Sequence, residues 1–111
     1  MWQKSIKTNL IVDQGANFVY KINLIDQSGN PFDISGYTAN AQIRKTYTST
    51  TYNTIACNVA GSNGVITLSM NASATANLAS NRYVYDLEIS NNNIVSRIAE
   101  GFVTVNPGVT R

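Results

Sequence analysis

The sequence predicts an all-β protein, a β-sandwich of about seven strands with one short helix. Several short segments alternate apolar and polar residues with a period of two, as strands with one buried face do. Asn and Thr are abundant, with 15 and 11 copies among 111 residues; Thr suits strands and Asn suits tight turns. Turn signals also separate the alternating segments at short intervals, which is typical of a sandwich.

Three segments, residues 17–25, 37–45 and 82–90, show the clearest alternation. Each places apolar side chains on one face and mostly polar ones on the other, whereas a helix would spread both sets around its axis. The predicted inward rows are Phe18, Tyr20, Ile22 and Leu24; Tyr37, Ala39, Ala41 and Ile43; and Tyr83, Tyr85, Leu87 and Ile89.

Weaker patterns predict four more strands and one helix. The strands are expected at residues 4–12, 54–59, 65–70 and 94–105, and the Ala-rich segment 71–78, opened by Asn71, is expected to form one or two helical turns. Gly101 lies inside the last strand and predicts a bulge that shifts the facing of Ile94, Ile98 and Phe102. This set of elements indicates one domain, residues 1–111, of the immunoglobulin-like sandwich type.

Composition argues against several partners. The chain carries 8 basic and 6 acidic residues, and the basic ones are scattered, so no stripe for a nucleic-acid backbone is expected. No secretion signal and no apolar run long enough for a membrane-spanning helix can be recognised. Cys57 is the only cysteine, which excludes an internal disulfide, favours assembly inside a cell and suggests a small core residue.

The residues needed for common catalytic chemistry are missing. Histidine is absent, which removes Ser–His and Cys–His pairs and the commonest zinc ligand. Asp86 and Glu88, about 7 Å apart on one strand face, could form a glycosidase pair, but we expect a solvated face balanced by Arg97 or Arg44. Too few ligands surround the other carboxylates, Asp26 and Asp33 among them, for calcium. We therefore predict no enzyme, cofactor, metal site or small-molecule substrate.

Three aromatic residues are the candidate contacts with other subunits. Trp2, the only tryptophan, stands before the first strand pattern and either packs over the edge of its own domain or anchors in a neighbour. Tyr47 and Tyr52 belong to the polar segment 46–53, which forms either a flexible loop or hairpin tip or a contact surface. Tyrosine among Ser, Thr and Asn supplies both apolar area and hydrogen bonds.

The order and spacing of several motifs resemble a known group of proteins. The motifs are Val12-Asp13-Gln14-Gly15, Asp33-Ile34-Ser35-Gly36-Tyr37, Tyr83-Val84-Tyr85-Asp86-Leu87-Glu88-Ile89 and Glu100-Gly101-Phe102-Val103-Thr104-Val105, followed by Pro107 to Arg111. With Gln42 to Arg44 and Gly64 to Leu68, they span nearly the whole chain. The chain resembles small virion proteins of tailed bacteriophages and the immunoglobulin-like N-terminal domain of phage baseplate upper proteins.

This resemblance implies a structural subunit of the virion, assembled in the host cytoplasm. The expected role is a tail or baseplate adaptor or connector that binds other phage subunits, and a second copy of the chain is a candidate partner. Because sheet edges can accept a neighbour's strand, residues 4–12 and 94–105 are candidates to extend across an edge. The alternatives are a capsid decoration protein and a carbohydrate-binding module; a module would use an aromatic platform, for which Tyr47 and Tyr52 are the loop candidates.

Overall fold

The computed structural model describes residues 6–26 and 28–109. Within them the chain is almost entirely β, with one short α-helix and one 3₁₀ turn. In chain order the elements are β1 (Ile6–Lys7), β2 (Leu10–Asp13), β3 (Phe18–Asn23), β4 (Thr38–Arg44), β5 (Asn53–Ala60), η1 (Gly61–Asn63), β6 (Val65–Met70), α1 (Ala72–Ala76), β7 (Asn81–Asn91) and β8 (Ile94–Asn106).

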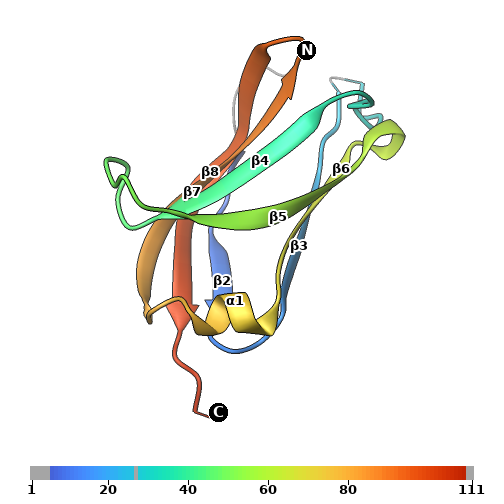
Figure 1. Ribbon diagram of the computed structural model, residues 1–111. Coiled ribbons are helices and arrows are strands. Elements are labelled where there is room, and N and C mark those ends of the chain that lie inside the picture. The colour runs from blue at the N-terminus through green and yellow to red at the C-terminus, as the bar shows by residue number, and fades with distance from the viewer. Residues whose placement is uncertain (1–5, 27, 110–111) are drawn as a thin grey trace.

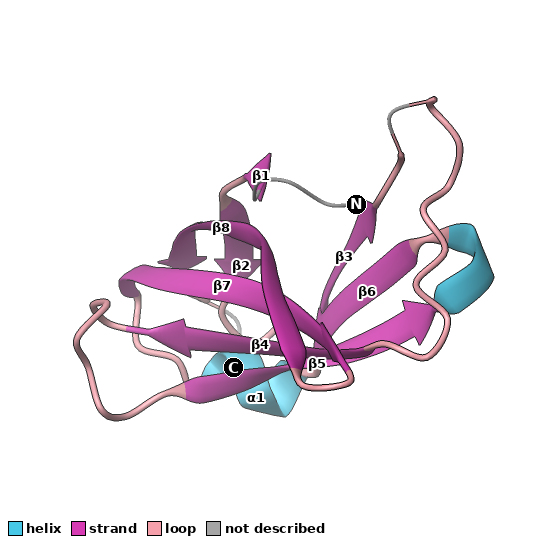
Figure 2. Ribbon diagram, turned by 90° about the horizontal axis from the view of Figure 1, so that it is seen from above, coloured by secondary structure: helices cyan, strands magenta, loops and turns pink. Residues whose placement is uncertain are grey.

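The strands form one mixed, curled sheet, as Figures 1 and 2 show. Hydrogen-bonded neighbours follow the order β1-β8-β7-β4-β5-β6-β3, and β2 also pairs with β8. β1 and β2 run parallel to β8, and all other pairs are antiparallel. The sheet therefore closes part of a barrel around the core, with β3 at one end of its path and β1 and β2 at the other.

Eight strands lie within the described residues because the predicted segment 4–12 forms two strands, β1 and β2. Thr8 and Asn9 separate them, and both are used in other contacts with the sheet. The Thr8 carbonyl accepts a hydrogen bond from the Tyr85 hydroxyl at 2.7 Å, and the Asn9 side chain accepts one from the Phe102 amide at 3.0 Å.

Strand β5 makes the bend that curls the sheet. Its first part pairs with β4, from Asn53 opposite Ile43 to Ile55 opposite Ala41. Its second part, residues 56–60, pairs with β6 instead. One strand thus connects β4, β7 and β8 to β6 and β3 (Figure 1).

The predicted apolar rows form the core, with one exception. All four inward residues of β7 are buried, Ala41 and Ile43 of β4 are buried, and Tyr37 and Ala39 pack against the core at its margin. The row of residues 17–25 is buried at Phe18, Ile22 and Leu24. Tyr20 is also predicted to point inward but is 37% exposed, because β3 ends the sheet and has no strand beyond it in the described residues to cover this ring.

The bulge predicted at Gly101 is in the wrong place. Gly101 lies in register opposite Tyr85, and the register shifts between Leu87 and Glu88, which are opposite Ala99 and Arg97. The extra residue is therefore Ile98, and Ile98 and Ala99 are both fully buried. The outer ends of the predicted set, Ile94 and Phe102, are exposed.

Gly101 is needed for a different reason, the close approach of another backbone segment. A Cβ atom there would lie 2.3 Å from the Thr8 carbonyl oxygen. Thr8 is fixed in that position, since its N–H donates to the Glu100 carbonyl at 3.0 Å and its carbonyl accepts from Tyr85. The glycine thus lets the segment between β1 and β2 lie directly against β8.

The helix forms where the Ala-rich segment predicted it. Asn71 is its N-cap, and the Asn71 side chain accepts a hydrogen bond from the Ala74 amide at 2.8 Å. Thr75, in the same turn, is fully buried, which no pattern in the sequence indicates. Its hydroxyl donates to the Ala16 carbonyl and accepts from the Gly15 amide, and so ties the helix to the loop between β2 and β3.

The buried hydroxyl of Tyr85 predicts a loss of stability in alkali. Burial, with smaller contributions from Tyr20 and Glu100, raises the pKa of Tyr85 above its ordinary value of 10.0. The folded state holds this proton more tightly than the unfolded chain, so the stabilisation is complete below pH 10.0 and is lost as the pH rises through the folded pKa. We expect the free energy of unfolding, measured in urea, to fall as the pH is raised above 10.0. The same free energy should fall less steeply with pH in Tyr85→Phe. Equal slopes for both proteins would contradict this assignment.

Candidate interaction surface

The side of the sheet turned away from the core carries most of the charged side chains near β4, β7 and β8. We call this surface the outer face. Because alternate residues of a strand point to opposite sides, the residues next to the buried rows belong to it. Its members include Gln42, Arg44, Arg82, Val84, Asp86, Glu88, Arg97, Glu100 and Phe102.

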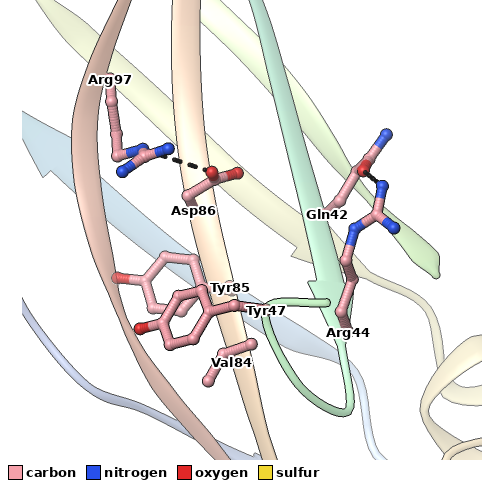
Figure 3. A pocket seen from close by; sticks show the side chains of 7 residues that line it. All are labelled: Gln42, Arg44, Tyr47, Val84, Tyr85, Asp86 and Arg97. Atoms are coloured by element: carbon pink, nitrogen blue, oxygen red, sulfur yellow. Dashed lines mark hydrogen bonds and ion pairs between the residues drawn. The ribbon is translucent and has the colours of Figure 1, made fainter. Parts of the chain in front are cut away.

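Near the loop between β4 and β5, the outer face is hollowed, with a volume of about 260 Å³. Tyr47, Val84 and Tyr85 supply its aromatic and apolar lining, and Gln42, Arg44, Asp86 and Arg97 surround them (Figure 3). Val84 points away from the core but is only 8% exposed, whereas Tyr47 is 68% exposed. The hollow thus has a covered apolar floor and a free aromatic ring at its side.

Hydrogen bonds fold the loop that carries Tyr47. The Ser49 amide donates to the Thr46 carbonyl at 3.2 Å, and the Thr46 amide donates to the Ser49 hydroxyl at 3.1 Å. The Arg44 guanidinium donates to the Ser49 carbonyl and, at 2.8 Å, to the Gln42 side chain. Arg44 therefore fastens the loop that carries Tyr47 to β4, and a loop held in place before binding loses less conformational entropy when a partner binds.

Tyr52 lies on the other side of Arg44. The guanidinium carbon of Arg44 is 4.9 Å from the centre of the Tyr52 ring, within the range of a cation–π contact. Tyr52 lines a second, more open hollow together with Lys45 and Thr51, and that hollow does not include Tyr47. The two exposed tyrosines therefore line different hollows, which share Arg44.

The charged part of the outer face is an ion-pair cluster. The Arg97 guanidinium lies 3.3 Å from the Asp86 carboxylate and 3.8 Å from that of Glu100. The expected cross-strand balance of Asp86 by Arg97 is confirmed; Arg44, the alternative partner, bonds the loop and Gln42 instead. Asp86 is thus held by a cation on the surface.

A second aromatic contact lies farther along the outer face. Phe102 is 44% exposed, and the guanidinium carbon of Arg82 lies 5.0 Å from the centre of its ring. Phe102 is opposite Val84 in register, so the apolar surface continues from the hollow towards β2. Sequence reasoning missed this contact because the predicted bulge left the facing of Phe102 open.

The other candidate residues have structural partners. The Asp26 carboxylate accepts hydrogen bonds from the Ser28 and Asn30 amides, and the Asp33 carboxylate accepts one from the Ser35 amide. Bonds from Ser35 lower the pKa of Asp33. Cys57 packs against the core, where burial raises the pKa of its thiol and disfavours the reactive thiolate.

The remaining expectations concern absent sites and one residue that cannot be placed. Within residues 6–26 and 28–109, no three His, Cys, Asp or Glu side chains gather as a metal site. In the same part of the chain, no helix has the length and apolar character needed to cross a membrane. Trp2 lies outside the described residues.

Comparisons with known proteins bear on the fold alone. No protein-family description matches the chain, and no curated protein matches it either. The chain is similar to the crystal structure of Listeria monocytogenes InlP, with a TM-score of 0.51 and 14% sequence identity. The match covers 92% of this chain and 28% of the InlP chain. It supports a β-rich architecture that recurs as part of a larger protein.

Proposed function

We propose that this chain is a structural subunit that acts by binding other proteins through its outer face. The observation that carries the proposal is the hollow that exposed Tyr47 and covered Val84 line together with Arg44 and Arg97. Tyr and Arg are enriched among residues that dominate binding energy at protein interfaces. Because Arg44, Arg82 and Arg97 are balanced by Asp86, Glu88 and Glu100 across this face, contact area and hydrogen bonds would supply most of the affinity.

We propose further that the subunit belongs to the virion of a tailed phage. The basis of this proposal is the sequence resemblance to small virion proteins and to the immunoglobulin-like domain of baseplate upper proteins. In the particle the subunit would serve as an adaptor or connector in the tail or baseplate. It would be assembled there in the host cytoplasm. A chain without recognised catalytic motifs and with an ordered contact loop fits such a role.

We also propose that the curled sheet is an immunoglobulin-like sandwich. Pairing of β3 with β6, and of β7 with both β4 and β8, supports this interpretation. So does one core cluster that contains Ile22 and Leu68 from one part of the sheet and Tyr85 and Val103 from the other. The strand β5, shared between the two parts, would be the link between the two layers.

The test is complementation of a phage whose copy of the gene has been deleted. We expect the wild-type chain, supplied from a plasmid, to be found in purified particles by mass spectrometry and at the tail in a particle reconstruction. Tyr47→Ala should lower its incorporation at least about tenfold, the effect of losing a strong interface residue. Lys45→Ala, an exposed change in the same loop, is the matched control and should leave incorporation unchanged.

Two results would reject the proposal. If phage particles made without this gene are complete and infectious, and differ from wild type only in lacking the chain, the structural role is ruled out. A Tyr47→Ala protein that folds and incorporates like wild type would rule out the outer face as the contact.

A further inference from the structure

Strand β3 has one open side. β3 is the last strand in the sheet path, and its only strand partner in the described residues is β6. The Leu24 amide donates to the Gly64 carbonyl at 2.8 Å and continues the β3–β6 ladder. Since peptide groups of alternate residues point the same way, those of Tyr20 and Ile22 face β6. The N–H and C=O groups of Val19 and Lys21 therefore face the open side.

The surface beside this edge has few charges. In register across β3, β6 and β5, the outward residues form three rows, of which only Lys21 is charged. The rows are Val19, Ser69 and Ala56; Lys21, Thr67 and Asn58; and Asn23, Val65 and Ala60. Depletion of charge is typical of the centre of a protein interface. Val19 is 62% exposed, so an apolar side chain also stands at the edge.

We propose that this edge pairs with β3 of a second copy of the chain, antiparallel and about a two-fold axis. In the proposed register Tyr20 lies opposite Tyr20 of the second copy, so that residues 18–22 of both strands are paired. Phe18 then lies opposite Ile22 on the side of the core, and Val19 lies opposite Lys21 on the outward side. The outward peptide groups of Val19 and Lys21 face each other in this register and can form both hydrogen bonds of each pair.

Charge and the length of β3 select this register over its two neighbours. A shift by one pair in one direction would place Lys21 opposite Lys21, and like charges directly opposite are destabilising. A shift by one pair in the other direction would leave only residues 18–20 of each β3 paired. In the proposed register each Lys21 stands opposite an uncharged Val19. A two-fold contact of this kind uses the same strand twice and closes after two copies.

The contact is small, so the dimer should be weak. One strand pair and its flanking side chains bury less than the roughly 1,200 Å² of a stable interface. We therefore expect monomer in dilute solution and dimer as the concentration of the full chain approaches about 1 mM in analytical ultracentrifugation. This association does not depend on the outer face, so Tyr47→Ala should leave it unchanged.

Two opposite changes at Val19 test the register. Val19→Glu places a carboxylate opposite Lys21 twice per dimer, and Val19→Lys places like charges there. Both change the same exposed position of the monomer and should leave its stability nearly equal. We expect the dissociation constant of Val19→Lys to exceed that of Val19→Glu at least about tenfold at low salt, with the gap closing as salt is added. Equal constants for the two variants would overturn the pairing.

A cysteine on the two-fold axis provides an independent measurement. Opposed residues that do not exchange hydrogen bonds have Cα atoms roughly 4.5 Å apart, within the span of a disulfide. Under oxidation, Tyr20→Cys should form a covalent dimer, whereas Lys21→Cys, which lies opposite Val19, should not. The proposal fails if wild type remains monomeric at about 1 mM, or if hydrogen exchange shows the Val19 and Lys21 amides already protected in the dilute monomer.

Discussion

Gly101→Ala is expected to lower the free energy of unfolding by about 3 kcal/mol, the sum of overpacking and a lost buried hydrogen bond. The new methyl group would meet the Thr8 carbonyl oxygen at 2.3 Å and the Asn9 side-chain oxygen at 2.9 Å. Thr8 must then move from β8, and this movement breaks its bond with the buried Tyr85 hydroxyl. Urea unfolding followed by circular dichroism measures the loss.

Gly15→Ala is the matched control for this change. Gly15 has a φ of +84°, and a methyl group added there would meet nothing within 4 Å, so this variant introduces backbone strain without a clash. Its cost should stay near 1 kcal/mol, that is about a third of the effect at Gly101. If both variants lose the same amount, the close approach of Thr8 does not account for the need for glycine at position 101.

Leu87→Ala should destabilise the domain by about 2–5 kcal/mol, the range for a leucine deleted from a packed core. Leu87 is fully buried and sits on β7, opposite Ala41 on one side and Ala99 on the other. Both neighbours are alanines, which cannot extend into the space, so most of the cavity will remain. The same urea titration measures the effect.

Ile94→Ala removes a similar aliphatic side chain from a place where it contributes little. Ile94 starts β8 and is 67% exposed, so its truncation should cost less than about 0.5 kcal/mol. A Leu87→Ala protein as stable as Ile94→Ala would mean that the concave side of the sheet is not a closed core.

The parts of the fold that follow from local pattern could be predicted. Strict alternation determines which side of β7 is buried, because a period of two leaves only one way to hide Tyr83, Tyr85 and Leu87 together. The cap at Asn71 similarly locates the helix, because its side chain bonds the first turn. These features depend on residues close in sequence.

The parts that depend on distant segments could not be predicted. The position of the bulge depends on how β7 and β8 are aligned, and Gly101 in the sequence shows only that a side chain is missing. Its actual neighbour, Thr8, is separated from it by nearly the whole chain. Tyr47 can be recognised from the composition of its loop, whereas Val84, which lines the same hollow, lies among residues that alternate normally.

The parallel pairing of β2 with β8 has a consequence for biosynthesis. Leu10 pairs with Val103 and Asp13 with Asn106, so the residues of each pair are 93 positions apart in the sequence. Contacts of such high sequence separation form slowly, and β8 leaves the ribosome after all the other described strands. Strand β2 must therefore wait, exposed to chaperones or to other nascent chains, until β8 has been translated.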